Sequence, residues 1–105
     1  MTIKNITPEA IIQATAEHYG VTISDIKAPG RTQSLVTPRQ MAMFLACKLT
    51  TDSLPDIGKS FDRKHTTVYY GSQQIQKRLS VEPDLKQAIA QISAKLGRKI
   101  SDVLE

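Results

Sequence analysis

Helix-start signals recur along the chain and constrain its fold more than any other sequence feature. A proline stands in each of four short runs typical of a first helical turn: Thr7-Pro8, Thr37-Pro38, Ser53-Leu54-Pro55 and Glu82-Pro83. Proline suits this position because the first backbone N–H groups of a helix have no intrahelical partner, and a nearby hydroxyl can cap one of them. Apolar residues at helical spacing follow each run. We expect helices over residues 8–19, 38–49, 54–60 and about 83–96.

Two further segments have helical character. Residues 22–26 can form a short helical turn, and a longer helix-compatible run extends from Arg63 or Lys64 to about residue 79. Asp62 is a candidate N-cap, which would leave residues 63–67 in the first turn of the longer helix. A short helix, a turn of about three residues and a longer helix with a polar head form a helix-turn-helix arrangement. The alternative is a run of solvated polar residues before an ordinary helix.

Length and composition set the class of protein. The 105 residues suffice for a single domain with one core, and 40% hydrophobic with 23% charged residues is an ordinary balance for a folded chain. No apolar run approaches the roughly 18 residues that span a bilayer, and the first residues lack the apolar core of a signal peptide. We expect a cytoplasmic, nucleoid-associated protein that is folded over about residues 7–97, with a flexible tail at residues 98–105.

Positive charge is concentrated in the middle of the chain. The net charge is +4, but residues 27–78 hold nine Lys or Arg against three Asp, a surplus of +6. This distribution favours a face that binds a polyanion, although solubility alone would explain a surplus of this size. Within this part, Lys27 and Arg31 lie in a loop that contains proline and glycine. The loop is either a surface connector or a basic arm.

Few residues suit catalysis or metal binding. Cys47, the single cysteine, lies in an apolar helical pattern, which indicates a small core or helix-flank residue. His18 and His65 are the two histidines and lie far apart in the sequence, so a metal pair has no support. We therefore expect no catalytic residues, no metal site and no enzyme activity.

Several side chains in the basic middle suggest either packing or recognition. Arg39 and Gln40 fall in an expected first helical turn, where they could bind a phosphate or simply begin a helix. Gly71 lies inside a helix, where glycine costs about 1 kcal/mol relative to alanine, so we infer a close approach of another helix. Tyr69 and Tyr70 could stack on bases, but we favour partial burial of at least one of them.

Three spaced motifs carry a family resemblance: residues 37–43 (TPRQMAM), residues 53–58 (SLPDIG) and residues 65–68 (HTTV). In order and spacing they resemble the C-terminal DNA-binding domain, domain IV, of the bacterial chromosomal replication initiator DnaA, over about residues 7–96. The resemblance implies an all-α, compact domain of about six helices that contains a helix-turn-helix. It also implies binding to DnaA boxes, which are A/T-rich duplex sites of the TTATNCACA type at the replication origin.

The resemblance assigns DNA contacts residue by residue. Base edges in the major groove would be approached by Arg63, His65 and Thr66, with Thr66 beside a thymine methyl group. Leu54 and Pro55 would also touch bases. Phosphates would be held by Arg39, Gln40, Thr67 and the backbone from Leu54 to Ile57. Arg31 matches the arginine that the family inserts into the minor groove, so the basic arm becomes the favoured interpretation of its loop.

Three departures from the family pattern affect the expected recognition. Lys64 stands where the family usually has Asp, and an ammonium group cannot accept a hydrogen bond from a cytosine amino group, so Lys64 would bind a phosphate or a guanine. The turn is about one residue shorter than the usual glycine-containing form, with Asp62 in its place, which predicts a slightly different entry angle. Thr37 replaces a residue that is often Arg, which removes one possible phosphate contact.

The sequence also sets expectations for ligands and partners. It has no G-x-x-x-x-G-K-[ST] phosphate loop, so we expect no ATP binding in the family's manner and no other cofactor. The expected partner is duplex DNA, with possible regulatory proteins on the outer helices, and the chain is expected to be a monomer in isolation. Two alternatives stay open: a helix-turn-helix domain of a transcription regulator, and a helical adaptor whose basic face binds an acidic protein.

Overall fold

Helices account for all the regular structure in the described part of the chain. The computed structural model describes residues 6–30 and 32–104, and within these ranges it has seven helices and no strand. They are α1 (Pro8–Tyr19), α2 (Ile23–Lys27), α3 (Gln33–Leu49), α4 (Leu54–Phe61), α5 (His65–Arg78), α6 (Pro83–Lys95) and α7 (Ser101–Leu104). The predicted all-α fold class is confirmed, with one helix more than expected.

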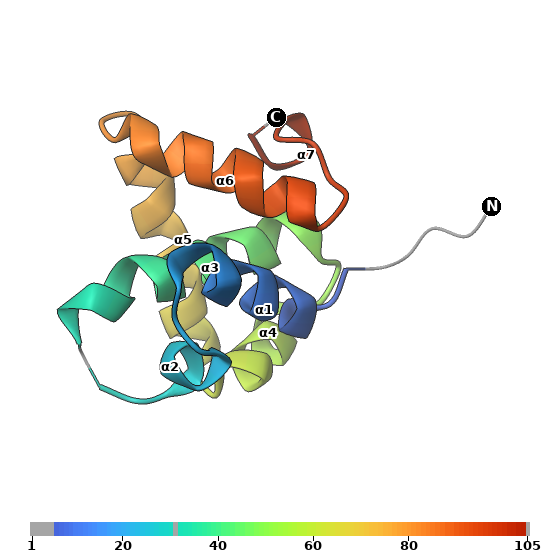
Figure 1. The fold of residues 1–105 in the computed structure, drawn as a ribbon. Coiled ribbons are helices and arrows are strands. Elements are labelled where there is room, and N and C mark those ends of the chain that lie inside the picture. Colours follow the sequence, from blue (N-terminus) through green and yellow to red (C-terminus); the bar gives the residue numbers. More distant parts are fainter. Residues whose placement is uncertain (1–5, 31, 105) are drawn as a thin grey trace.

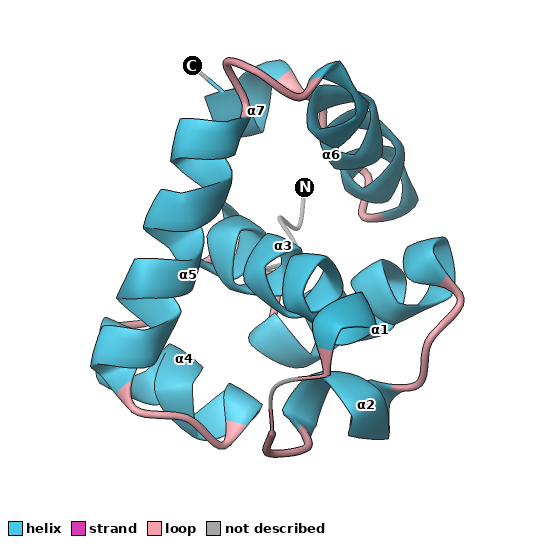
Figure 2. Cartoon of the chain, turned by 90° about the vertical axis from the view of Figure 1, so that its left-hand side faces the viewer, coloured by secondary structure: helices cyan, strands magenta, loops and turns pink. Residues whose placement is uncertain are grey.

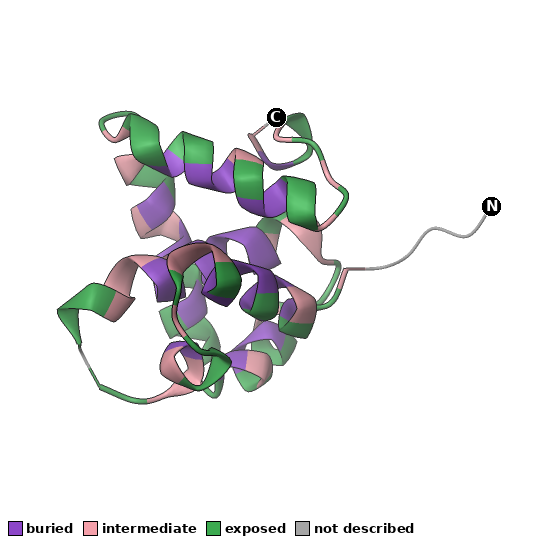
Figure 3. Ribbon diagram, viewed as in Figure 1, coloured by how far each residue is buried: buried purple, intermediate pink, exposed green. Residues whose placement is uncertain are grey.

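The central helix is α3, which packs against α1, α2, α4, α5 and α7 (Figure 1). Figure 2 shows α5 along one side of α3, with α1 on the opposite side. The residues from Met41 to Ala46 are all buried, and Phe44 and Leu45 have no exposed surface. Burial on all sides follows from the apolar circumference of this segment. The buried residues gather where α3 crosses its neighbours (Figure 3).

The first turns of α3 differ from the prediction. The helix begins at Gln33, so the predicted start at Pro38 is wrong, and Pro38 is buried inside the helix. The first N–H groups of a helix lack intrahelical partners, and Pro38 lies little more than a turn from the start, so its missing N–H removes a single backbone bond. Leu35 and Val36 are half-buried in the added turn. Burial of their apolar surface offsets that loss.

The C-terminal segment is folded, which overturns the prediction of a flexible tail. α7 packs against α3, and Val103 is only 1% exposed. Ile100 and Leu104 pack partly against the same core. These three residues have the i, i+3, i+4 spacing of one helix face, and the N–H of Lys99 donates to Oδ2 of Asp102 at 3.0 Å. Residue 105 lies outside the described residues.

Most other helix boundaries follow the sequence signals. The hydroxyl of Thr7 accepts a hydrogen bond from the N–H of Ala10 at the start of α1, and Gly20 ends that helix in the left-handed conformation. The hydroxyl of Ser53 caps α4 in the same way. Across the described ranges, no helix combines the length and hydropathy that crossing a membrane requires.

Candidate nucleic-acid interface

A three-residue turn joins α4 to α5, as predicted. Asp62 ends α4 in the left-handed conformation (φ 56°, ψ 45°), and the N–H of Arg63 donates to the carbonyl of Gly58 at 2.8 Å. The predicted role of Asp62 as N-cap of the next helix is therefore wrong. Aspartate tolerates the left-handed conformation better than most residues, so it can end a helix where glycine often does. Lys64 is the N-cap residue of α5, which begins at His65.

Gly58 allows this turn to lie close against α4. A Cβ atom at position 58 would be 2.6 Å from the carbonyl oxygen of Arg63 and 3.2 Å from the backbone nitrogen of His65. A Cβ atom essentially never lies within 3.0 Å of such a neighbour, and ordinary contacts begin at 3.4 Å. Because both neighbours are backbone atoms, a side chain at this position would displace the start of α5. Gly58 thus permits the observed position of the first turn of α5.

The head of α5 is exposed and polar. Lys64, His65, Thr66 and Thr67 are all exposed, and Lys64 provides no side-chain cap for the helix. The first backbone N–H groups of a helix lack intrahelical acceptors and carry the positive end of the helix dipole. The structure thus brings these four predicted contact residues together at a helix start. The ammonium, imidazole and hydroxyl groups of these residues can donate hydrogen bonds to a ligand, and the threonines also present methyl groups.

Behind this head, α5 packs closely on α3. Val68 and Ile75 have no exposed surface, and a Cβ atom at Gly71 would be 2.6 Å from Sδ of Met43. The predicted close approach of another helix at Gly71 is confirmed. The contact holds the exposed head at a defined distance from the central helix.

Tyr69 and Tyr70 are exposed on two different flanks of α5. They are 54% and 61% exposed, so the prediction that at least one is partly buried in the core is wrong. The signal was present in the sequence, because the inward stripe of Val68, Gly71 and Ile75 leaves the two tyrosines outside the core, one on each flank of the stripe. They extend the exposed surface that begins at residues 64–67.

Two arginines predicted to contact DNA are held by backbone carbonyls. Arg39 is 6% exposed inside α3, so the premise that it lies in an exposed first turn is wrong. Its guanidinium donates to the carbonyls of Asp25 and Gly30. Arg63 is half-buried and donates to the carbonyls of residues 27 and 28. Direct DNA contacts from these two arginines stay predictions, and the donors in question already have acceptors within the protein.

A groove of about 720 Å³ lies between the first half of α3 and α5. Arg39, Gln40 and Thr67 are among the residues that line it, so three of the predicted phosphate contacts share one hollow, together with Tyr70. Gln40 is half-buried there. Thr37, one turn earlier, accepts a hydrogen bond from Nη2 of Arg78 at 3.0 Å and so joins α3 to the end of α5.

Of the three contact residues predicted at the start of α4, two are at least partly exposed. Pro55 is exposed and Leu54 is half-buried in the first turn of this helix. Ile57 is 2% exposed, and its N–H donates to the carbonyl of Ser53 at 2.9 Å. Neither its side chain nor its N–H is available to a ligand in this structure. The predicted minor-groove residue, Arg31, lies outside the described residues, and its role stays a prediction.

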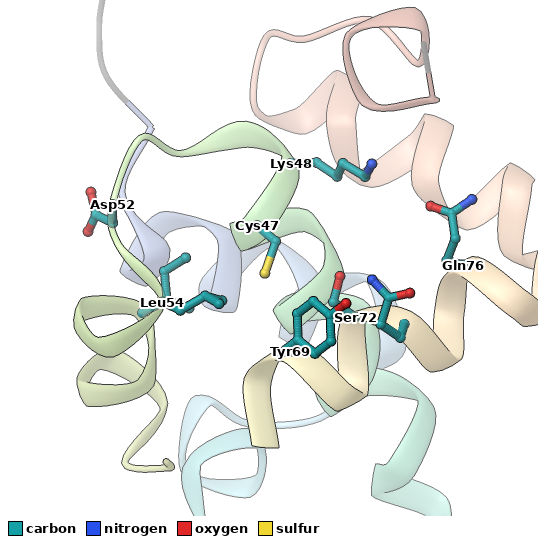
Figure 4. Close-up of a pocket in the computed structure, with 9 residues that line it drawn as sticks. Cys47, Lys48, Asp52, Leu54, Tyr69, Ser72 and Gln76 are labelled. Carbon is teal, nitrogen blue, oxygen red and sulfur yellow. The ribbon is translucent and has the colours of Figure 1, made fainter. Parts of the chain in front are cut away.

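A second hollow of about 300 Å³ opens between α3, the start of α4 and α5 (Figure 4). Cys47, Tyr69 and Ser72 are among the residues that line it. Burial raises the pKa of the Cys47 thiol, which is the opposite of what a cysteine nucleophile needs. Cys47 is the half-buried helix-flank residue that the sequence predicts. In residues 6–30 and 32–104, no group of three or more His, Cys, Asp or Glu is arranged to hold a metal ion.

The supporting helix α4, the tight turn and the exposed head of α5 define a helix-turn-helix domain. The family model described as the bacterial DnaA protein helix-turn-helix matches residues 8–75, which extend from the start of α1 into α5. The chain therefore belongs to the family of bacterial DnaA helix-turn-helix domains.

Two curated relatives are chromosomal replication initiator proteins DnaA. Over 94 residues, the chain is 44% identical to the protein of Caulobacter sp. strain K31 and 39% identical to that of Symbiobacterium thermophilum strain DSM 24528. Both matches cover 89% of this chain but only 19% and 20% of the relatives. The chain thus spans about a fifth of the length of the curated relatives it matches.

Proposed function

We propose that this chain binds double-stranded DNA sequence-specifically at DnaA boxes, as the DNA-binding domain of a chromosomal replication initiator. The observation that carries the proposal is the exposed cluster from Lys64 to Thr67 at the head of α5, in a member of the DnaA helix-turn-helix family. Residues at the start of a recognition helix contact base edges in the major groove in this class of domain. The binding needs no nucleotide, metal or catalytic step.

Each residue of the cluster suits a particular contact. Thr66 can place its methyl group against a thymine methyl, and the His65 ring can hydrogen-bond a base edge. Thr67 lines the groove beside α3, where its hydroxyl and that of Tyr70 can bind a phosphate. Lys64 supplies a cation for a phosphate or for the O6 and N7 acceptors of a guanine.

Other contacts complete the proposed interface. Leu54 and Pro55 at the start of α4 would border the same groove of the DNA, and Gln40 would hold a phosphate from α3. Arg31 would enter the adjacent minor groove, where a narrow A/T-rich segment attracts a guanidinium. The folded unit would extend from α1 to α7 as one domain.

A titration followed by fluorescence anisotropy tests the proposal. Two labelled duplexes, one carrying TTATCCACA and one a scrambled sequence, are compared at about 0.15 M salt, where charge effects are screened beyond roughly 8 Å. We expect a clear preference for the box. Preference for a different sequence would favour a transcription regulator. Weak, equal binding that disappears with added salt would favour an adaptor with a basic face.

Thr66→Ala tests the groove assignment within the box. We expect it to remove about 1–3 kcal/mol of discrimination at one thymine-containing base pair while random duplex binds as before. Ser80→Ala is the matched control, because Ser80 is an exposed hydroxyl residue beyond the other end of α5. An equal loss of affinity for box and random DNA in Thr66→Ala would contradict a base contact.

A further inference from the structure

Two guanidinium groups from different elements hold the last turn of α2 and the loop that joins it to α3. Arg39 lies inside α3, and Arg63 lies in the turn before α5. We call this pair the arginine clasp. Its acceptors are the backbone carbonyls of Asp25, Lys27, Ala28 and Gly30. The clasp therefore connects the loop to the central helix and to the helix-turn-helix turn at the same time.

Arg39 forms the buried half of the clasp. Its Nε and Nη2 atoms donate to the carbonyl of Asp25 at 3.1 and 2.8 Å, and its Nη1 atom donates to the carbonyl of Gly30 at 2.8 Å. The carboxylate of Asp25 is engaged elsewhere, because it accepts the N–H of Thr22 in the capping box of α2. A planar guanidinium can reach both carbonyls at once, whereas a lysine ammonium is a single point of charge.

Arg63 forms the half that reaches from the turn. Its Nη1 atom donates to the carbonyl of Lys27 at 2.9 Å, and its Nη2 atom donates to that of Ala28. These partners are 36 and 35 positions away in the sequence, so the loop and the turn meet only through the tertiary fold. A guanidinium engaged in this way has few donors left for a base edge.

The clasp brings two cations close together, and the nearby Asp25 carboxylate offsets part of their repulsion. The ion pairs among the described residues are Arg78 with Glu82 and Lys95 with Glu17, and neither involves the clasp. Burial, and then the nearby Arg63 cation, lower the pKa of Arg39. The carbonyls of Asp25 and Lys27 lie in the last turn of α2, where the helix dipole favours a cation. The same pair of side chains also reaches Ala28 and Gly30, so it joins the loop to both α3 and the turn before α5.

We propose that the arginine clasp positions the loop after α2 relative to the head of α5, so that the basic loop and the recognition helix reach one duplex as a single unit. Arg39 and Arg63 are then positioning residues, and Arg63 is not a base reader. A helix in the major groove and an arm in the neighbouring minor groove must keep a fixed spacing to act together. The inference rests on the proposed function for its ligand, whereas the clasp itself is a property of the free protein.

The first test uses the free protein. Arg63→Lys keeps the charge but loses the planar fork. Arg78→Lys is the matched control because Arg78, at the end of α5, is likewise a half-buried, hydrogen-bonded arginine. NMR relaxation should show lower backbone order parameters at Ala28 and Gly30 in Arg63→Lys, and unchanged values there in Arg78→Lys. Unchanged order in Arg63→Lys would overturn the clasp.

The second test is a double-mutant cycle on box DNA with Arg31→Ala. Arg63→Lys should weaken box binding about tenfold with an unchanged salt dependence, and this loss should nearly vanish when Arg31 is already alanine. If the double variant loses box affinity by the product of the two single-variant factors, Arg63 makes its own DNA contact and the positioning role is wrong. If the wild-type protein shows no box preference, the proposed function fails, and the relaxation measurement alone decides the clasp.

Discussion

Gly58→Ala is the sharpest test of how the turn positions the recognition helix. The added methyl group would sit 2.6 Å from the carbonyl oxygen of Arg63, about 1 Å inside a normal contact. Since the opposing atoms belong to the backbone, relief requires the turn to move away from α4. That movement would also weaken the 2.8 Å hydrogen bond from the N–H of Arg63 to the carbonyl of Gly58.

The magnitude follows from two opposing effects. Alanine in place of glycine favours a helix by about 1 kcal/mol, whereas overpacking of a tight site costs about 1–3 kcal/mol. A contact with rigid backbone belongs at the upper end of that cost, so we expect a net loss of about 1–2 kcal/mol. For a domain of this size, the melting temperature should fall by roughly 5–15 °C.

Thermal unfolding of Gly58→Ala and Gly71→Ala side by side provides the assay. At Gly71 the methyl group would meet Sδ of Met43, near the end of a flexible side chain that can move aside. Gly71→Ala should therefore stay within about 1 kcal/mol of the wild type. Box affinity of Gly58→Ala, measured well below its melting temperature, should fall as well, because the head of α5 moves. If Gly58→Ala is as stable as Gly71→Ala, the reasoning about the turn is refuted.

Three further predictions concern the tail, an ion pair and specificity. Val103→Ala should lower the free energy of unfolding by about 1.5–3 kcal/mol in urea titrations, because Val103 is buried; a flexible tail would give no change. The hydrogen bond from Arg78 lowers the pKa of Glu82 below 4.5, so its contribution is full above that value and is lost as the pH falls through the lowered pKa. Glu82→Gln should therefore destabilise the protein at pH 7 and have little effect on its urea midpoint at about pH 2. Lys64→Asp should increase preference for a cytosine at one box position while weakening random binding, as measured by anisotropy with substituted boxes; an unchanged base preference would place Lys64 on a phosphate.

Local signals in the sequence located most of the helices. The hydroxyl of Thr7, the hydroxyl of Ser53 and the glycine at position 20 act within one turn of themselves, so their effect can be read without knowing the fold. The same holds for the glycine inside α5, whose cost in a helix predicted the close contact at Gly71. The exposed cluster of residues 64–67 follows from the short turn before α5, which places these residues at a helix start.

Where local sequence signals conflict or are weak, tertiary packing decides where a helix begins and whether it forms. Pro38 is a good first residue of a helix, but burial around Leu35 and Val36 supports an earlier start. The segment after α6 has few apolar residues, and its short helix is stable because Val103 finds a place against α3. A helix of this length has little stability of its own, so its neighbour decides whether it forms.

The sequence by itself determined an all-α helix-turn-helix domain and the polar residues at the head of its second helix, α5, because helix periods and caps act over a few residues. Only the tertiary structure decided which protein acceptors the arginines bind. Arg39 and Arg63 have the same charge as a phosphate-binding arginine, and their acceptors in α2 and the loop after it lie 9 to 36 positions away along the chain. A guanidinium binds whatever acceptor the fold places beside it, and no local pattern shows which acceptor that is.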